Sequence, residues 1–381
     1  IALFLPYRAD GEKFVLFVLP KEPGQEIWTG VRSGVEVAIN DFGADIAHPL
    51  EQFSSLLSYY LQGAEGIFFR IGKNTKIETI VLKVWQEHLD KIQRNGLPPL
   101  SLEAPCPLIH KLRLIKEQYE LVRLREASRI SAEAHEIARM LAKPGMTERQ
   151  IQAEIEKHFL IEGARGPAYP SIVASGDNAC VLHYTKNNSQ LCNDELLLID
   201  AGCSLNDYYN GDITRTFPVN GVFTPEQLAI YQIVLSAQEA AISFAIEGQT
   251  AEAVHLEALK VLIEGLLDIK LLKGSVESII EEESYRHLYM HRTGHWLGLD
   301  VHDVGAYRLG EQDIELKESM VLTVEPGLYI SDRLPVPKGQ PEIGDCWKGI
   351  GIRIEDNVAV GLNSPEILTS KALKSVEDMQ K

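Results

Sequence analysis

The sequence predicts an α+β fold in which helices pack outside a curved antiparallel sheet. Two helix-like segments that open on a Gly-x-Thr turn and reach Ile-Glu-Gly occur at 144–163 and 247–265. Each is followed by an apolar strand-like run that delivers one acid just before a glycine, LLLIDAG at 196–202 and VLTVEPG at 321–327. A second acid follows in each half, within GDITRT and GIRIED. Helices followed by strands in both halves indicate a duplicated α/β unit.

Composition indicates an ordinary soluble globular protein. A chain of 381 residues with 45% hydrophobic content can bury a sizeable core, and its length favours two or three domains. The excess of 54 acidic over 37 basic residues gives a net charge of −17, which argues against nucleic acid or an anionic membrane as partner. The five cysteines include no C-x-x-C pair, which favours reduced thiols and a cytoplasmic location; they are Cys106, Cys180, Cys192, Cys203 and Cys346.

The first 104 residues alternate strand-like and helix-like stretches. IALFLPY and KFVLFVLP flank the turn RADGE and predict a hairpin. IETIVLKVWQEHLDKIQR at 77–94 predicts an apolar strand followed by an amphipathic helix, and the four prolines of NGLPPLSLEAPCP then break regular structure. We therefore expect an N-terminal α/β domain over 1–111 and a second domain over 112–381. Because the chain opens in mid-strand and without Met, we also expect that its natural start is missing.

Helices are predicted at three places in the second domain. Residues 117–142 carry an apolar stripe of Leu121, Leu124, Ile137 and Leu141, and Pro144 with Gly145 ends that helix. Two Thr-x-x-Gln capping boxes predict two further helix starts, at Thr147 to Gln150 and at Thr224 to Gln227, the second with Pro225 at the first helical position.

Five side chains in the second domain are of metal-ligand type: Asp200, Asp212, His295, Glu325 and Glu355. An acid on an apolar strand loses several kcal/mol of hydration unless a partner neutralises it. Any one of the four acids could instead be a strand-end residue turned to solvent. Their recurrence in paired motifs favours a shared metal site, to which each half of the duplicated unit gives two acids.

The segment MHRTGHWLGLDVHDVG supplies histidines at 291, 295 and 302. A lone histidine is more often a satisfied core residue, but the glycines at 294, 298 and 305 indicate a functional loop or strand. An H-E-x-x-H zinc helix is excluded because Arg292 and Thr293 stand where its glutamate would lie.

This ligand set indicates the metal and the chemistry. Carboxylates with one imidazole and no thiolate suit Mn(II), Co(II) or Mg(II) better than structural zinc, although zinc also fits. Two cations about 3.5–4 Å apart share a water whose lowered pKa yields hydroxide, a hydrolytic nucleophile. No phosphate-binding glycine loop, no G-x-S-x-G elbow and no cysteine nucleophile with a partner is present in the sequence.

Together, IDAGC, GDITRTFPV, HRTGHWLGLDVHDVG, LTVEPGLYI and GIRIEDNV resemble motifs of the Xaa-Pro aminopeptidases, also called aminopeptidase P, of the creatinase and methionine aminopeptidase clan. The resemblance covers nearly the whole chain. It implies a "pita-bread" metallopeptidase domain over 112–381 and a creatinase-type N-terminal domain with its first portion absent. It also implies a dinuclear, manganese-preferring enzyme that releases the residue preceding proline.

The same resemblance implies a role for each matching residue. Asp200 would bind one metal through both oxygens, Asp212 and Glu355 would bridge the pair, and His295 and Glu325 would complete the other site. Glu325 would also be the general acid/base towards the metal-bridging hydroxide, and His291 would hydrogen-bond the scissile carbonyl or its oxyanion. His183 would line the substrate pocket, His302 would lie near the proline, and Arg353 would be the active-site arginine. From the residues alone, the less favoured alternative is that Arg353 is only a partner for acidic neighbours.

The chain departs from the family pattern in three places. SLNDYYN separates Asp200 from Asp212 by one residue more than the commoner spacing, in a turn that we expect to leave both acids at the metals. LKESM at 316–320 lacks a usual Pro-Gly, and LPVPKGQPEIGDCWKG at 334–349 is expected to be a longer loop. An Xaa-Pro dipeptidase (prolidase) shares all five ligands and is the alternative enzyme, and a non-catalytic pita-bread protein is the alternative from another class. Family members commonly form dimers or tetramers. Trp28 could contribute to a shared wall of the site, although an ordinary buried or surface aromatic is the favoured interpretation.

Overall fold

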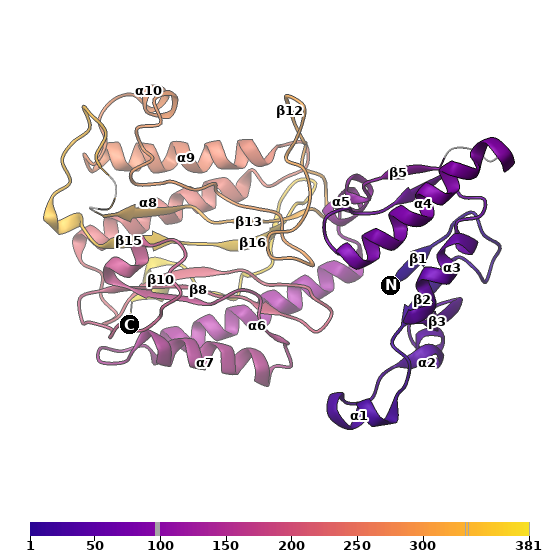
Figure 1. Ribbon diagram of the computed structural model, residues 1–381. Coiled ribbons are helices and arrows are strands. Elements are labelled where there is room, and N and C mark those ends of the chain that lie inside the picture. The colour runs from indigo at the N-terminus through magenta and orange to yellow at the C-terminus, as the bar shows by residue number, and fades with distance from the viewer. Residues whose placement is uncertain (96–99, 332, 334, 381) are drawn as a thin grey trace. The chain divides into compact units, whose positions relative to one another are not determined.

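The structure is a computed structural model that describes residues 1–95, 100–331, 333 and 335–380. The chain divides into two compact units, Ile1–Ile109 and His110–Lys381 (Figure 1). The predicted break at NGLPPLSLEAPCP falls partly on 96–99, and those four positions lie outside the described residues. Helix α5, Cys106–Leu114, contains the division between the two units.

The smaller unit is a small α/β layer, as predicted. Strands β1 and β2 pair antiparallel and confirm the hairpin, while β2 and β3 pair parallel, as do β4 and β5. The strands are β1 (Ala2–Phe4), β2 (Phe14–Val18), β3 (Ile46–Pro49), β4 (Gly66–Phe68) and β5 (Ser101–Glu103). The helices are α1 (Pro23–Thr29), α2 (Gly34–Asn40), α3 (Phe53–Tyr60) and α4 (Thr75–Asn95).

The strand predicted at the start of IETIVLKVWQEHL is wrong, because α4 covers this whole segment. Its apolar residues Ile77, Ile80, Val81 and Val84 follow the i, i+3, i+4, i+7 spacing of one helix face. Val81 and Val84 are buried in the core of this unit. The apolar residues 80–82 had suggested a strand, but the helical spacing of apolar residues over the whole segment predicts the observed helix.

Helices of the larger unit begin where the capping boxes predict. Thr147 caps α7 (Glu148–Ile161) and Thr224 caps α8 (Pro225–Ser243), each by accepting the backbone N–H of the glutamine three residues on. The other helices are α6 (Gln118–Leu141), α9 (Ala251–Asp268), α10 (Val276–Glu281) and α11 (Val376–Met379).

Two details of the predicted helices are wrong. On α6 the buried face continues through small and polar side chains such as Ser131 and Ala138, so Leu141 is exposed. Helix α9 does not end at Ile-Glu-Gly but continues through Gly265. A Cβ on Gly265 would lie 2.6 Å from Cγ1 of Ile233, so this glycine lets α8 and α9 pack closely.

All strand pairs of the larger unit are antiparallel, among the residues that the structure describes. One half has the order β10-β8-β7, and the other has β13-β16-β17 and β14-β15. These strands are β7 (Ile172–Ser175), β8 (Leu196–Asp200), β10 (Thr214–Pro218), β13 (Val321–Val324), β14 (Gly327–Ile330), β15 (Ile350–Arg353), β16 (Asp356–Ala359) and β17 (Glu366–Ile367). The short pairs are β6 (Gly166–Pro167) with β9 (Cys203–Ser204), and β11 (Arg308–Leu309) with β12 (Gln312–Asp313).

Helices cover the outside of these strands, which is the predicted pita-bread arrangement. In Figure 1, α6 and α7 lie on one side of the strands and α8 and α9 on the other. The main core fills the space between them, with residues such as Leu124, Ile199, Ile230 and Ile352 fully or almost fully buried.

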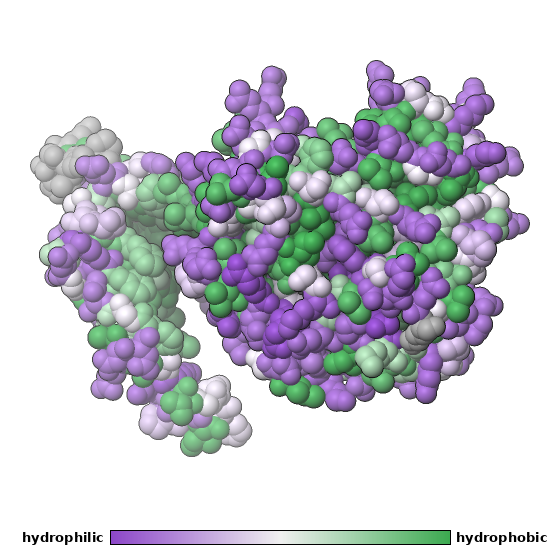
Figure 2. All heavy atoms as spheres, turned by 180° about the vertical axis from the view of Figure 1, so that it is seen from behind, coloured by the Kyte–Doolittle hydropathy of each residue, from purple (hydrophilic) through white to green (hydrophobic). Residues whose placement is uncertain are grey.

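The surface of the larger unit is mainly hydrophilic on one face. On the face shown in Figure 2, hydrophilic residues spread over the larger unit and apolar residues form patches between them. Within the described residues, no helix has both the length and the apolar character that crossing a bilayer requires. The segment predicted as a longer loop, apart from Leu334, which is not described, is irregular except for a short 3₁₀ turn at Asp345–Trp347.

Candidate metal centre

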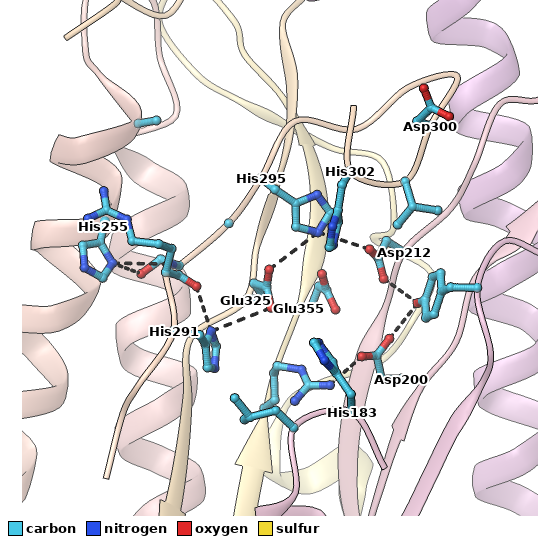
Figure 3. A pocket seen from close by; sticks show the side chains of 18 of the residues that line it. His183, Asp200, Asp212, His255, His291, His295, Asp300, His302, Glu325 and Glu355 are labelled. Atoms are coloured by element: carbon cyan, nitrogen blue, oxygen red, sulfur yellow. Dashed lines mark hydrogen bonds and ion pairs between the residues drawn. The ribbon is translucent and has the colours of Figure 1, made fainter. Parts of the chain in front are cut away.

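A single cavity of about 1180 Å³ is lined by all nine site residues that the sequence predicts. Asp200, Asp212 and His183 come from the first half of the duplicated unit, and the histidines at 291, 295 and 302 come from the connecting loop. Glu325, Arg353 and Glu355 come from the second half. In Figure 3 the side chains of Asp200, Asp212, His295, Glu325 and Glu355 gather around one space, whereas the labelled His255 and Asp300 lie farther out.

The two aspartates come together because their segments cross. Asp200 ends β8, and its register partner on β10 is Thr214, so Asp212 lies two residues before β10 rather than on a strand. A Cβ on Gly202 would lie 1.8 Å from the carbonyl oxygen of Gly211, so only glycine allows this crossing. The longer SLNDYYN turn does not move either acid out of the cavity.

In the second half, too, the acids lie on backbone outside the strands. Glu325 directly follows β13, and Glu355 lies between β15 and β16. The loop before His295 runs along β13, where the His295 N–H donates to Thr323 Oγ1 at 3.0 Å. A Cβ on Gly294 would lie 1.9 Å from the Thr323 carbonyl oxygen, which explains the glycine. Asp212, Glu325 and Glu355 therefore lie next to strands and not within them. Outside a regular strand, a side chain is not bound to the alternation between the two faces of the sheet.

His295 has the hydrogen-bond arrangement of a metal ligand. Its Nδ1–H donates to the Trp296 carbonyl at 3.0 Å, which fixes the tautomer and leaves Nε2 facing the acids. Nε2 lies 3.4 Å from Asp212 Oδ2 and 3.6 Å from Glu325 Oε1. A lone pair aimed at two carboxylates is repulsive unless a proton or a cation lies between them.

Three of the predicted ligands already form a compact donor set. One donor atom from each of Asp212, His295 and Glu355 lies within 4.8 Å of the other two. Glu355 is held by Thr214, whose Oγ1–H donates to its Oε2 at 2.7 Å. Glu325 lies beside the set.

Asp200 lies in the same cavity but is held by protein groups. Arg353 Nη2 donates to its Oδ2 at 2.5 Å, and the Tyr169 hydroxyl donates to its Oδ1 at 2.7 Å. Tyr169 also contacts Asp212, so it ties the two aspartates together. Arg353 is therefore a partner of an acid and also a lining residue of the cavity.

A hydrogen-bonded chain connects Arg353 to His291 through Tyr329. Arg353 Nη1 donates to the Tyr329 hydroxyl at 3.0 Å, and that hydroxyl lies 2.8 Å from His291 Nε2. His291 Nδ1 lies 2.8 Å from the Arg292 carbonyl, so the neutral ring donates from Nδ1 and accepts at Nε2. To donate to a substrate carbonyl, His291 must exchange its bond to Tyr329 and carry the proton on Nε2.

Sequence reasoning missed Tyr169, Thr214 and Tyr329. Two of the three stood inside quoted motifs, Thr214 in GDITRTFPV and Tyr329 in LTVEPGLYI. Tyr169 had no motif around it.

The charges of the cluster are poorly compensated. Burial raises the pKa of Asp200 and of Glu355, and raises that of Glu325 to about 7. Burial disfavours the charged form of His295, yet its hydrogen bond to Asp212 and the charge of Glu325 raise its pKa to about 9. Burial and nearby Arg353 lower the pKa of His291 to about 3, which keeps that ring neutral.

This donor set fits divalent cations. Arg353 and a protonated His295 supply only two positive charges against four carboxylates, too few to let all the acids ionise together. Hard divalent cations supply that charge, and they prefer oxygen and imidazole donors. The residues present therefore match the metals that the sequence predicts.

In the metal-free protein, Glu325→Gln is expected to gain stability relative to the wild type as pH rises. The folded pKa of about 7 lies above the ordinary 4.5, so the stability that Glu325 contributes is present below pH 4.5 and lost as pH rises through 7. Glutamine undergoes no such loss. The difference in unfolding free energy should grow by about 1.4 kcal/mol per pH unit between those values and then level off.

Urea unfolding of both proteins in a chelator, from pH 4.5 to 8, measures this difference. Comparing the variant with the wild type cancels the titration of groups that do not interact with Glu325, whereas His295 and Glu355 interact with it and contribute to the measured difference. A difference that does not change with pH would mean that Glu325 has an ordinary pKa.

The remaining two predicted histidines, His183 and His302, also line the cavity. The His302 ring packs edge-on against His295, with 4.2 Å between ring centroids. His183 lines the same cavity, and Figure 3 labels it there. The structure thus brings every predicted site residue to one cavity.

Comparison with known families and structures matches both units. The family model described as metallopeptidase family M24 matches residues 122–361, and the one described as aminopeptidase P, N-terminal domain, matches residues 1–68. The first match contains all nine predicted site residues.

Full-length relatives give the same result. An Xaa-Pro aminopeptidase from Haemophilus influenzae is 38% identical over 379 residues, covering 100% of this chain and 84% of the relative. The solved structure of Pseudomonas aeruginosa aminopeptidase PepP is 40% identical, has a TM-score of 0.92, and is matched over 99% of this chain and 83% of that one. An Escherichia coli aminopeptidase P variant in complex with substrate is 38% identical, with a TM-score of 0.88 and coverage of 96% and 81%.

Proposed function

This chain belongs to metallopeptidase family M24. On that premise we propose which of its buried acids and histidines bind metal, transfer protons and bind substrate in an Xaa-Pro aminopeptidase. The enzyme is a peptide hydrolase that releases the N-terminal residue of peptides with proline in the second position. One observation carries the proposed site: five metal-type ligands from distant motifs line one cavity together with His183, His291, His302 and Arg353.

Two divalent cations, preferentially Mn(II), would be held by the five ligands. Asp200 would serve one site, His295 and Glu325 the other, and Asp212 and Glu355 both. The compact set of Asp212, His295 and Glu355 supports the shared position of the two bridging acids. When bound, the cations acidify a shared water and polarise the scissile carbonyl.

Glu325 would move the proton of the reaction. It takes a proton from the attacking water and passes it to the proline nitrogen as the C–N bond breaks, so that water is added across the peptide bond. A pKa of about 7 in the metal-free site shows how strongly burial acts on this carboxyl group. His291 would donate from Nε2 to the carbonyl oxygen after releasing Tyr329.

Recognition of proline follows from its chemistry. An Xaa-Pro bond is a tertiary amide without an N–H, so a cavity that recognises the ring accepts it, whereas one that requires an N–H donor does not. His302 and His183 at the cavity wall would face the proline and the rest of the substrate. The free amine of the substrate would bind a metal or an acid, which limits cleavage to the first bond.

A peptide assay tests this function. With Mn(II), the protein is expected to convert Xaa-Pro-Yaa into Xaa and Pro-Yaa, and to leave Xaa-Ala-Yaa and N-acetylated Xaa-Pro-Yaa intact. Parallel assays with Co(II), Mg(II) and Zn(II) rank the metals. Cleavage of the dipeptide Xaa-Pro alone would identify a prolidase instead.

We also propose a cytoplasmic homo-oligomer, a dimer or a tetramer. All five cysteines are free thiols, which supports a reducing compartment. The side chains of Ile27 and Trp28 on α1 are 82% and 84% exposed, a pattern typical of surfaces that pack against a partner. Light scattering coupled to gel filtration measures the assembly.

A further inference from the structure

Glu148 is a buried acid outside the metal centre that contacts no cation. It is the first residue of α7, is 0% exposed, and forms no ion pair among the described residues. Burial of an unpaired carboxylate is costly, so its retention needs hydrogen bonds from neighbouring groups. These bonds all come from one segment, residues 175–189.

Four donors of this segment point at the Glu148 carboxylate. Oε1 accepts from the Ser175 N–H at 2.8 Å and from the Asn178 side-chain amide at 3.0 Å. Oε2 accepts from the Ser189 N–H at 2.8 Å and from the Tyr184 hydroxyl at 2.9 Å. The Glu148 N–H in turn donates to the Ser189 carbonyl at 2.9 Å, so the acid closes both ends of the segment.

The middle of this segment forms part of the wall of the substrate cavity. His183 and Thr185 line the cavity and are exposed, whereas Tyr184 between them is buried and turned to Glu148. Successive side chains of this segment therefore point to opposite sides. Tyr184 faces Glu148, whereas His183 and Thr185 face the cavity. Fixing Tyr184 therefore fixes the backbone from which His183 and Thr185 project.

His183 depends on this anchor for its place. No hydrogen bond to its ring is found within the part of the chain that the structure describes. In this it differs from His291 and His295, whose rings are held by hydrogen bonds at Nδ1. The His183 ring therefore takes its position from its backbone.

We propose that Glu148 is a positioning residue that, through Tyr184, sets His183 and Thr185 against the peptide substrate. The inference rests on the proposed function, because it concerns the same cavity. Glutamine in place of Glu148 has the same shape but aims an NH₂ group at donors, so at least one bond must break. Contacts that the substrate makes throughout the reaction affect KM and leave kcat unchanged.

Three variants test the proposal. Glu148→Gln should raise KM for Xaa-Pro-Yaa about tenfold and Tyr184→Phe about threefold, each with kcat almost unchanged. Tyr231→Phe is the matched control, because Tyr231 is also buried and its hydroxyl donates to the Lys374 carbonyl at 2.8 Å, away from the cavity. This control should keep the wild-type KM even though it loses one buried hydrogen bond.

Amide hydrogen exchange gives a second readout that does not depend on activity. Glu148→Gln should speed exchange in residues 176–190 and leave residues 321–330 unchanged. Wild-type exchange and KM in this variant would overturn the proposal, as would an equal rise of KM in Tyr231→Phe. If Glu148→Gln does not fold, Tyr184→Phe decides by the same measures. If the wild type cleaves no Xaa-Pro peptide, the proposed function fails, and exchange alone decides whether Glu148 holds the segment.

Discussion

Replacing Glu355 by glutamine is expected to lower kcat/KM for Xaa-Pro-Yaa by roughly a thousandfold or more, the scale of losing a group essential to the chemistry. Glu355 is 2% exposed and belongs to the compact donor set with Asp212 and His295. A neutral amide is a far weaker ligand than a carboxylate, and it removes one of the charges that hold divalent cations. The variant should also bind less metal.

The same substitution is expected to stabilise the metal-free protein near pH 7. Burial and the charge of Asp212 raise the pKa of Glu355, which means that its ionised form is disfavoured there. Thermal unfolding with and without Mn(II) measures both effects. The variant should melt above the wild type in chelator and gain little on adding metal. Glu366→Gln, at an exposed acid paired with Arg125, is the control for loss of one charge.

A full complement of metal in Glu355→Gln, with wild-type melting behaviour in both conditions, would contradict the assignment of Glu355 as a ligand. Loss of activity with normal metal content would instead indicate that this acid acts only on substrate.

Replacing Arg353 by methionine is expected to destabilise the metal-free protein by about 3–5 kcal/mol, the cost of removing one partner from a buried ion pair. Arg353 is 4% exposed, and its guanidinium group donates to Asp200, Tyr329 and Thr214. Methionine fills similar space and supplies no donor. Activity should also fall, because both Asp200 and the Tyr329–His291 contact lose their support.

Urea unfolding in chelator measures this effect, and a second substitution tests its cause. Arg353→Met combined with Asp200→Asn should recover much of the lost stability, since the unpaired buried charge is then gone. Arg123→Met, at an exposed pair with Asp207, should cost about 1 kcal/mol or less. Equal losses of unfolding free energy in the Arg353 and Arg123 variants would show that the buried pair of Arg353 stabilises the protein no more than an exposed pair does.

Sequence reasoning succeeded where the signal is local or chemical. The capping boxes at Thr147 and Thr224, the β1–β2 hairpin and the antiparallel sheet with outer helices are all observed. It was wrong where a short apolar run suggested a strand inside a segment whose apolar residues follow helical spacing, as in α4. It was also wrong where a glycine serves packing and not termination, as Gly265 does in α9.

The sequence by itself determined which residue types could hold metals and which halves of the chain supply them, because acids in apolar surroundings are costly wherever they lie. Only the tertiary structure decided how those groups face one another. Gly202 and Gly294 let backbone segments approach so closely that neighbouring acids meet, and Tyr169, Tyr329 and Glu148 orient the groups around them. These contacts join residues far apart in the chain, and no local pattern specifies which donor meets which acceptor. The candidate ligands could therefore be predicted from the sequence, whereas the orientation of each group depends on how the chain crosses itself.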